Sequence, residues 1–162
     1  MLGKVETSLA EKGFELPKAA SPAANYVPYT ITESLVYVSG QITYLNGKLK
    51  FIGRLGENID VETGYHAAQL CGLNLIAQVK EACSGDLERV KKVIRLGGFV
   101  NSSPDFSEHP TVINGASDLM VAAFGTAIGQ HSRFAVGVAS LPLGVAVEVD
   151  ATFKMHEADS HN

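Results

Sequence analysis

The stretch RFAVGVASLPLGVAVEVDATF, residues 133–153, predicts two β-strands joined by a tight turn. Valines alternate with small or polar residues on both sides of the turn, and a period of two is typical of strands with one buried face. The turn itself, Leu141-Pro142-Leu143-Gly144, carries proline and glycine where a chain reversal favours them. We therefore expect a β-hairpin over this stretch.

The register of this hairpin decides which side chains share a face. If Ser140 pairs with Val145, the valines of both strands lie on one face, and Arg133, Glu148 and Asp150 lie on the other beside alanines and glycines. Small residues next to charged ones indicate a hollow for a ligand, although a solvated face with a surface ion pair is the alternative. A slip of one residue would exchange the two faces. The opposed pairs in this register are Ser140–Val145, Gly137–Glu148 and Ala135–Asp150.

The same stretch resembles the C-terminal signature of a known family. Arginine, then VGV, LP and VEV followed by an acidic residue and alanine, is similar to the pattern of the YjgF/Rid family, the reactive-intermediate (enamine/imine) deaminases. The segments SPAANYVPY, YVSGQI and FVNSSPDF resemble further family segments in the same order, and Asn114 opens the next helix as the family's asparagine does. The resemblance covers roughly residues 20–153.

This resemblance implies a fold, an assembly and an activity. The fold is an α+β, chorismate-mutase-like one with a single mixed sheet and two helices on one face. The assembly is a homotrimer with sites in the clefts between subunits. The activity is the hydrolytic deamination of 2-imino or enamine acids of the 2-aminoacrylate type to 2-keto acids and ammonia, as in 2-iminobutanoate/2-iminopropanoate deaminases.

The chemistry of two side chains fits that activity. An arginine fork binds a carboxylate through two parallel charge-assisted hydrogen bonds, and a glutamate can orient water for attack on an imine carbon. Arg133 and Glu148 would take these roles, and by resemblance Tyr26, Ser39 and Asn114 complete the pocket. An imine is already activated, so we expect no metal and no organic cofactor.

Departures from the family pattern keep other functions open. Phe134-Ala135 follows the arginine where the family often has Ser-Cys, and the N-terminal extension marks a divergent subgroup. One alternative is a trimer that binds small carboxylates or acts as a chaperone without catalysis. Another, less favoured, is an endoribonuclease or translation inhibitor, as some relatives are described.

Composition restricts the class of protein. A chain of 162 residues fits one domain, and 46% hydrophobic against 19% charged residues indicates either a large core or a surface that is partly buried against other subunits. A net charge of −4 argues against nucleic-acid binding, which favours basic proteins. The N-terminus lacks an apolar signal segment, and no apolar run looks long enough for a membrane. We expect a cytoplasmic protein with no membrane contact.

The predicted elements alternate along one domain, residues 21–153, flanked by an extension over residues 1–20 and a polar tail over residues 154–162. Asn46-Gly47 is a strong hairpin signal within an opening β-meander. A helix over about 61–82 follows Asp60 as N-cap, then a strand over 90–100, a helix ending near 124, and the two strands above. This order predicts one mixed sheet covered by helices on one face only, so that the other face packs on another copy.

Two cysteines, Cys71 and Cys83, fall twelve residues apart in one predicted helix. Twelve helical residues span roughly 18 Å, whereas a disulfide needs Cα atoms within about 7 Å. An internal disulfide is therefore excluded, and both residues are expected to be free thiols in a reducing compartment.

Overall fold

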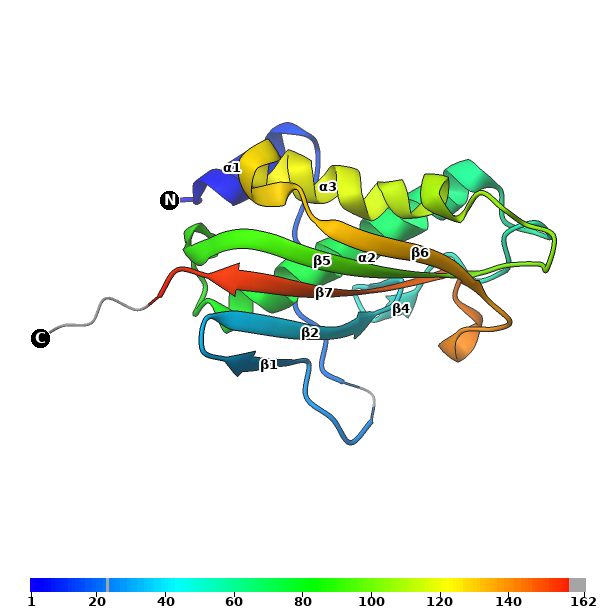
Figure 1. Ribbon diagram of the computed structural model, residues 1–162, viewed down its shortest axis with the longest axis horizontal. Coiled ribbons are helices and arrows are strands. Elements are labelled where there is room, and N and C mark those ends of the chain that lie inside the picture. The colour runs from blue at the N-terminus through cyan, green and yellow to red at the C-terminus, as the bar shows by residue number, and fades with distance from the viewer. Residues whose placement is uncertain (23, 158–162) are drawn as a thin grey trace, which may run out of the picture.

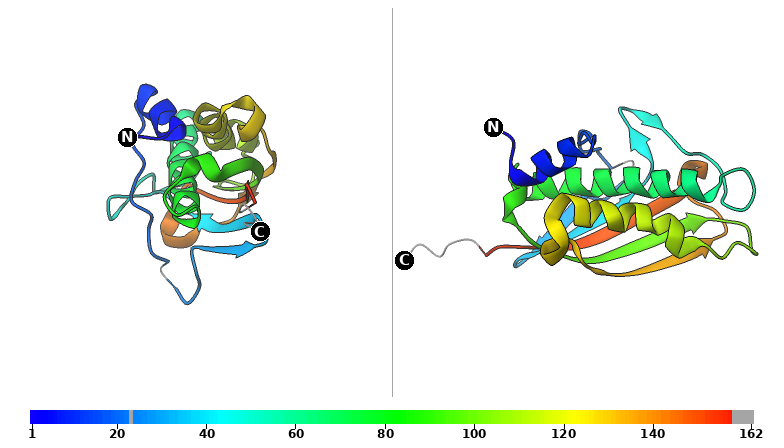
Figure 2. Two further views of the ribbon diagram at one scale, coloured as in Figure 1. Left: turned by 90° about the vertical axis from the view of Figure 1, so that its left-hand side faces the viewer. Right: turned by 90° about the horizontal axis from the view of Figure 1, so that it is seen from above.

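The computed structural model describes residues 1–22 and 24–157, and the last residues of the predicted polar tail lie outside this part of the chain. Within it, one five-stranded mixed sheet has the order β1-β2-β7-β5-β6, and helices α2 and α3 lie on one face of it (Figures 1 and 2). The predicted α+β fold with one main sheet is thus confirmed. The main strands are β1 (Tyr29–Thr32), β2 (Leu35–Gln41), β5 (Val90–Asn101), β6 (Ser132–Val138) and β7 (Val147–Met155). The helices are α1 (Lys4–Glu11), α2 (Val61–Ala82) and α3 (His109–Gly129), with single 3-10 turns at Leu87–Arg89 and Pro142–Gly144.

The predicted hairpin between β6 and β7 is wrong, because β5 lies between the two strands. β6 pairs with β5 in parallel and places Ala135 beside Gly98, while β7 pairs with β5 antiparallel and places Val149 beside Gly98. Alternation within a strand shows that one face is buried, but it does not name the neighbouring strand or the buried face. Here Ala135 lies on the helix-covered face, so the predicted face assignment is wrong as well.

Helix α2 follows its sequence signals closely. Its N-cap is Asp60, whose Oδ1 accepts a hydrogen bond from the Thr63 backbone N–H at 2.8 Å, and it ends at Ala82 as predicted. The helix packs tightly on α3, because a Cβ added at Gly115 would fall within contact distance of the Tyr65 backbone carbonyl. The glycine therefore sets how closely the two helices approach.

Helix α3 covers the sheet and has a break near its end. Gly125 adopts φ 79° and ψ 165°, which interrupts the helix where the sequence predicts its end, and a final turn follows to Gly129. By length and composition alone α3 could cross a membrane, contrary to expectation. Its residues Val112, Ile113 and Ala116 are fully buried against the rest of the fold, as in the core helix of a globular domain.

Two shorter elements complete the described chain. β3 (Tyr44–Leu45) and β4 (Lys48–Leu49) form the predicted hairpin, in which Asn46 and Gly47 adopt the positive φ values of 51° and 78°. The N-terminal helix α1 packs on the domain: Leu9 is 1% exposed, and the Val5 N–H donates to Glu88 Oε1 at 3.3 Å.

Candidate functional site

Arg133 points from β6 towards helix α3. Its Nη1 donates to Ser117 Oγ at 3.0 Å and its Nη2 to the Pro110 carbonyl at 3.1 Å. These two bonds use two of the five N–H groups of a guanidinium, so three remain for a ligand. The residues that follow on the same face, Ala135 and Gly137, are small, and an added Cβ at Gly137 would lie 2.5 Å from His109 Nε2 and 2.6 Å from Ser102 Oγ. The predicted face with an arginine and small residues therefore exists on β6, but Glu148 and Asp150 of β7 are not part of it.

Asn114 lies on the same side of α3. Pro110, Asn114 and Ser117 are spaced by four and three residues, which places them on one helix face. Because Arg133 bonds to the first and the last of the three, its guanidinium lies over the turn that carries Asn114. The structure thus brings together Arg133 and Asn114, which the sequence places 19 residues apart.

Glu148 lies on the opposite face of the sheet, which no helix covers. It is directly across from Phe99 on β5, which in turn is across from Val136 on β6, and residues across from each other share a face. A Cβ added at Gly40 would overlap the Glu148 carboxylate, so a larger residue here would displace the end of the glutamate side chain. Burial and the neighbouring Asp150 raise the pKa of Glu148 above its usual value.

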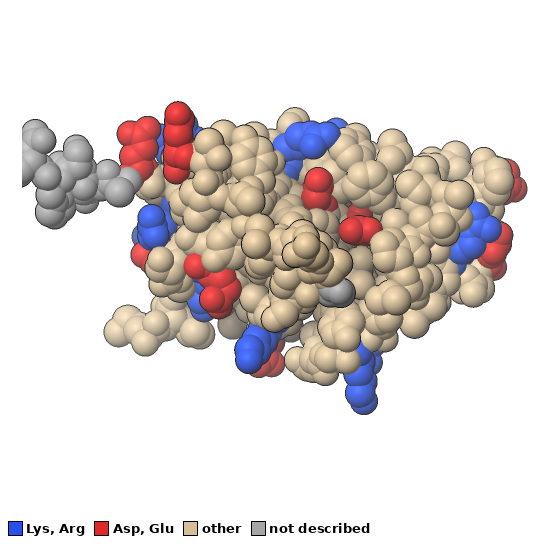
Figure 3. Space-filling view, turned by 90° about the horizontal axis from the view of Figure 1, so that it is seen from below, with Lys and Arg blue, Asp and Glu red and all other residues tan. Residues whose placement is uncertain are grey.

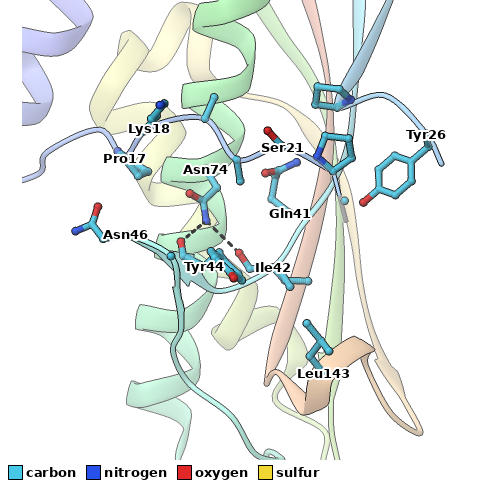
Figure 4. A pocket seen from close by; sticks show the side chains of 16 residues that line it. Pro17, Lys18, Ser21, Tyr26, Gln41, Ile42, Tyr44, Asn46, Asn74 and Leu143 are labelled. Atoms are coloured by element: carbon cyan, nitrogen blue, oxygen red, sulfur yellow. Dashed lines mark hydrogen bonds between the residues drawn. The ribbon is translucent and has the colours of Figure 1, made fainter. Parts of the chain in front are cut away.

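Ser39 and Tyr26 lie at the edge of the same region. Ser39 Oγ donates to the Val27 carbonyl at 2.8 Å and so holds the segment before β1 against β2. Tyr26 is 50% exposed and lines a cavity of about 540 Å³ that also includes Gly40, the residue in contact with Glu148. Figure 4 shows Tyr26 at one side of this cavity and Asn46 at the other. Asn74 shapes its wall by donating to the carbonyls of Ile42 and Tyr44 at 3.0 and 2.9 Å.

The five predicted site residues therefore fall into two groups. Arg133 and Asn114 lie on the helix-covered side of the sheet edge, whereas Glu148, Ser39 and Tyr26 lie on or beside the open face. The expectation that Arg133, Glu148 and Asp150 share one face is wrong. Burial raises the pKa of Asp150, and the positive charge of Arg95, whose guanidinium also stacks over the Phe134 ring at 4.7 Å, offsets this rise in part.

Comparison with known proteins settles the family. Residues 6–151 match the model of the family described as "YjgF/chorismate mutase-like, putative endoribonuclease". The chain belongs to the YjgF family. It is 46% identical over 154 residues to protein TCP17 of Trypanosoma cruzi, which covers 95% of this chain and 96% of that protein.

Solved structures support this assignment to the YjgF family. The protein Atu1372 from Agrobacterium tumefaciens, of unknown function, shares 47% identity over 94% of this chain and 92% of its own, with a TM-score of 0.89. A "putative endoribonuclease" from Shewanella oneidensis shares 40% identity over 94% of this chain and 100% of its own, with a TM-score of 0.90. Escherichia coli TdcF with bound serine shares the fold with a TM-score of 0.62, at 22% identity over 86% of this chain and 94% of its own.

This YjgF-family chain has a second hollow that the sequence does not reveal, of about 390 Å³ near the end of β6. Ser102 Oγ lies 3.2 Å from His109 Nε2, and Arg54 Nη2 donates to the Ser102 carbonyl at 2.7 Å. Its signs in the sequence are Ser102 and Ser103 within the FVNSSPDF segment and His109 shortly after it. Its lining residues are Arg54, Ser102, Ser103, Pro104, Phe106, His109, Gly137, Val138 and Ala139.

Residues 1–22 and 24–157 contain no group of three or more His, Cys, Asp or Glu side chains placed to hold a metal ion. Cys71 and Cys83 are buried and free, and burial raises the pKa of both thiols, which keeps them protonated and unreactive.

Proposed function

We propose that this protein hydrolyses small 2-imino and enamine acids to 2-keto acids and ammonia in sites formed between copies of the chain. Arg133 and Asn114 of one protomer would face Glu148, Ser39 and Tyr26 of the next. The observation that carries this proposal is the placement of the arginine and the glutamate on opposite faces of one sheet. Within one chain they cannot act on the same small molecule, but two chains packed face to edge can supply both.

The open face of the sheet offers a surface for such packing. Phe99 and Phe134 meet edge to face on it with ring centroids 5.2 Å apart, and Val136 is 43% exposed beside them. Viewed from the β1 edge of the sheet, the molecule shows mainly uncharged surface, with a few acidic side chains near its middle and lysines and arginines closer to the outline (Figure 3). An apolar face of this kind favours burial against another protein surface. The number of copies, three, comes from the resemblance to the family.

The two groups suit imine hydrolysis. Arg133 would hold the substrate carboxylate through its remaining N–H groups. Ionised Glu148 would take a proton from water as the water oxygen bonds to the imine carbon, and the imine nitrogen takes up a proton. Glu148 then returns its proton to the amine, and the C–N bond breaks as the carbinol hydroxyl gives its proton to the Glu148 carboxylate, which leaves ammonia and a keto acid. Glu148 passes this proton to solvent and so replaces the proton that the imine nitrogen took up from solvent. A carboxylate whose pKa is raised towards the working pH is a stronger base for this step.

Two further observations support a ligand of this size and class. The structurally similar TdcF carries bound serine, an amino acid with the carboxylate that Arg133 would anchor. The cavity of about 540 Å³ that Tyr26 and Gly40 line has the size of a site for a small molecule.

The decisive experiment mixes two inactive variants. Arg133→Ala and Glu148→Gln should each abolish acceleration of imine loss when imino acids are generated in solution by an amino-acid oxidase. Refolded together in equal amounts, the two variants should regain activity, because about one cleft in four then receives an intact arginine from one protomer and an intact glutamate from another. If the mixture stays inactive while the parent is active, the site does not lie between copies.

The same preparations separate the alternatives. A parent protein that binds a 2-keto acid but does not accelerate imine loss would be a carboxylate binder without catalysis. Cleavage of a labelled RNA by the parent, lost in Arg133→Ala, would support an endoribonuclease and contradict the deaminase proposal.

A further inference from the structure

A chain of hydrogen bonds runs behind Arg133 and ends in a histidine. Gly129 O lies 2.6 Å from His131 Nδ1, and Ser117 Oγ lies 2.8 Å from His131 Nε2. Arg133 Nη1 donates to the same Ser117 Oγ at 3.0 Å. One continuous chain of hydrogen bonds thus links Gly129, His131, Ser117 and Arg133.

The chemistry of these groups fixes the direction of every bond. A carbonyl oxygen can only accept, so His131 must carry its proton on Nδ1. The other nitrogen of a neutral imidazole then accepts, and the Ser117 hydroxyl donates to it. The Ser117 oxygen keeps its lone pairs for the Arg133 N–H. With neutral His131 the Ser117 hydroxyl donates to Nε2 and accepts from Arg133, whereas with protonated His131 the Ser117 oxygen would accept from both His131 and Arg133.

The surroundings keep this histidine neutral. Burial lowers the pKa of His131, and the positive charges of Arg133 on β6 and Lys92 on β5 lower it further, against the opposing effect of the Gly129 carbonyl. Lys92 is held nearby because its Nζ donates to the Ala127 carbonyl in the last turn of α3 at 2.8 Å. The acid next to Ser117 on α3, Asp118, accepts from Tyr65 on α2 at 2.8 Å.

The break at the end of α3 builds the acceptor for His131. Gly125 turns the chain with a positive φ, and the last turn brings Gly129 close to Met120. A Cβ added at Gly129 would lie 2.5 Å from the Met120 carbonyl oxygen, so a larger residue would displace the Gly129 carbonyl from the histidine. The local backbone is therefore shaped around this contact.

We infer that Ser117 and neutral His131 are positioning residues that hold the Arg133 guanidinium in the orientation that receives the substrate carboxylate. The carboxylate ligand rests on the proposed function, whereas the hold on the arginine does not. When His131 gains a proton, Nε2 becomes a donor, the Ser117 hydroxyl loses its acceptor, and the Ser117 oxygen faces two cations. The anchor then loosens, so carboxylate binding weakens in acid.

The test compares Ser117→Ala and His131→Gln with matched controls in the full chain. Ser132→Ala removes the neighbouring hydroxyl, which donates to the Ile94 carbonyl instead. His66→Gln removes an exposed histidine that contacts Gln69 and the Tyr65 ring on its own helix. Neither control side chain takes part in the hydrogen bonds that hold the Arg133 guanidinium. Ser117→Thr keeps a hydroxyl at position 117 and should behave as the parent.

The first readout is the nitrogen-15 NMR signal of the Arg133 guanidinium, which does not depend on activity. We expect slow rotation of its Nη groups in the parent and both controls, and faster rotation in Ser117→Ala and His131→Gln. The parent should show a His131 signal protonated on Nδ1 at neutral pH. Unchanged rotation in Ser117→Ala, or a proton on Nε2 of His131, would overturn the inference whether or not the protein hydrolyses imines.

The second readout is kinetic and links the device to the proposed function. Ser117→Ala should raise KM about tenfold, as expected for one lost hydrogen bond to a charged group, and change kcat less than about twofold. The parent KM should rise as the pH falls below the ordinary histidine value of 6.5, and this rise should vanish in His131→Gln. Faster guanidinium rotation in the two variants, together with a parent that does not hydrolyse imines, would support the inference and refute the deaminase proposal. An active parent whose KM is unchanged in Ser117→Ala would refute the inference alone.

Discussion

At the scale of single residues, two charged groups carry the proposed chemistry and differ in their surroundings. Arg133 is held by Ser117 and the Pro110 carbonyl, with N–H groups left over. Glu148 is half-buried beside a glycine and an aspartate, and its pKa is raised. One group is therefore built to bind with fixed geometry, and the other is built to exchange a proton.

Replacing Arg133 by lysine should fail nearly as badly as replacing it by alanine. Lysine keeps the charge but loses the planar fork and the two bonds that orient it. A lost bidentate charge-assisted contact is worth roughly 3 kcal/mol, or about two powers of ten in kcat/KM. Steady-state kinetics on imino acids check this, and an Arg133→Lys variant within threefold of the parent would show that the fork is not the anchor.

Glu148→Gln should lower kcat and at the same time stabilise the fold at neutral pH. Because the folded-state pKa of Glu148 is raised, the folded protein holds this proton more tightly than the unfolded chain does. Ionised Glu148 therefore destabilises the fold above that pKa, and the penalty disappears as the pH falls through it. Urea unfolding at pH 7 should show a higher unfolding free energy for Glu148→Gln and no change for Glu81→Gln, an exposed acid on α2.

The parent rate should follow the same ionisation. Since ionised Glu148 is the base, kcat should fall as the pH drops through its raised pKa, above the ordinary 4.5. A kcat that stays flat down to that ordinary value would remove Glu148 from the role of base.

At the scale of elements, the close approach of α2 and α3 positions the helix face that receives Arg133. This approach depends on Gly115, where an added Cβ would meet the Tyr65 backbone carbonyl rather than a movable side chain. Backbone cannot rotate away as a side chain can, so the helices would have to separate. The contact between Gly115 and the Tyr65 carbonyl therefore packs the core and also positions the helix face that receives Arg133.

Gly115→Ala should cost about 1–3 kcal/mol of unfolding free energy, as overpacking does in a dense core. Gly85→Ala is the control, since Gly85 has φ 88° and no atom within 4 Å of an added Cβ, so that only backbone strain of about 1 kcal/mol applies. Denaturant unfolding of both variants measures the difference. Equal losses for the two variants would show that α2 and α3 can separate at little cost.

At the scale of the whole molecule, the uncovered sheet face and the split site have one common explanation. Two helices cover one side of a five-stranded sheet and leave Glu148 with the phenylalanines on the other (Figure 2). A second copy on this face would bury the apolar side chains and bring an arginine near the glutamate. Assembly and catalysis would then depend on the same surface.

Val136→Glu should dissociate the assembly and abolish imine hydrolysis together. It places a charge in the middle of the open face, where desolvation would oppose association. Leu2→Glu is the control, because Leu2 is 66% exposed on the N-terminal segment. Light scattering at micromolar protein concentration measures the mass of the assembly for the parent and both variants. A parent that is already a stable monomer, or a monomeric Val136→Glu variant with full activity, would contradict a site between copies.

The sequence by itself determined the elements and the family, because capping, turn and alternation signals act locally. Asp60 begins α2, Asn46-Gly47 turns the short hairpin, and Gly125 ends the main part of α3, each where the residues predict it. The tertiary structure alone decided the strand partners. Alternation in β6 and β7 fits any neighbour, and only the whole sheet inserts β5 between them. That insertion places Arg133 and Glu148 on opposite faces, and the packing of α3 on β6 adds Ser117 and His131, which no local pattern connects to the arginine.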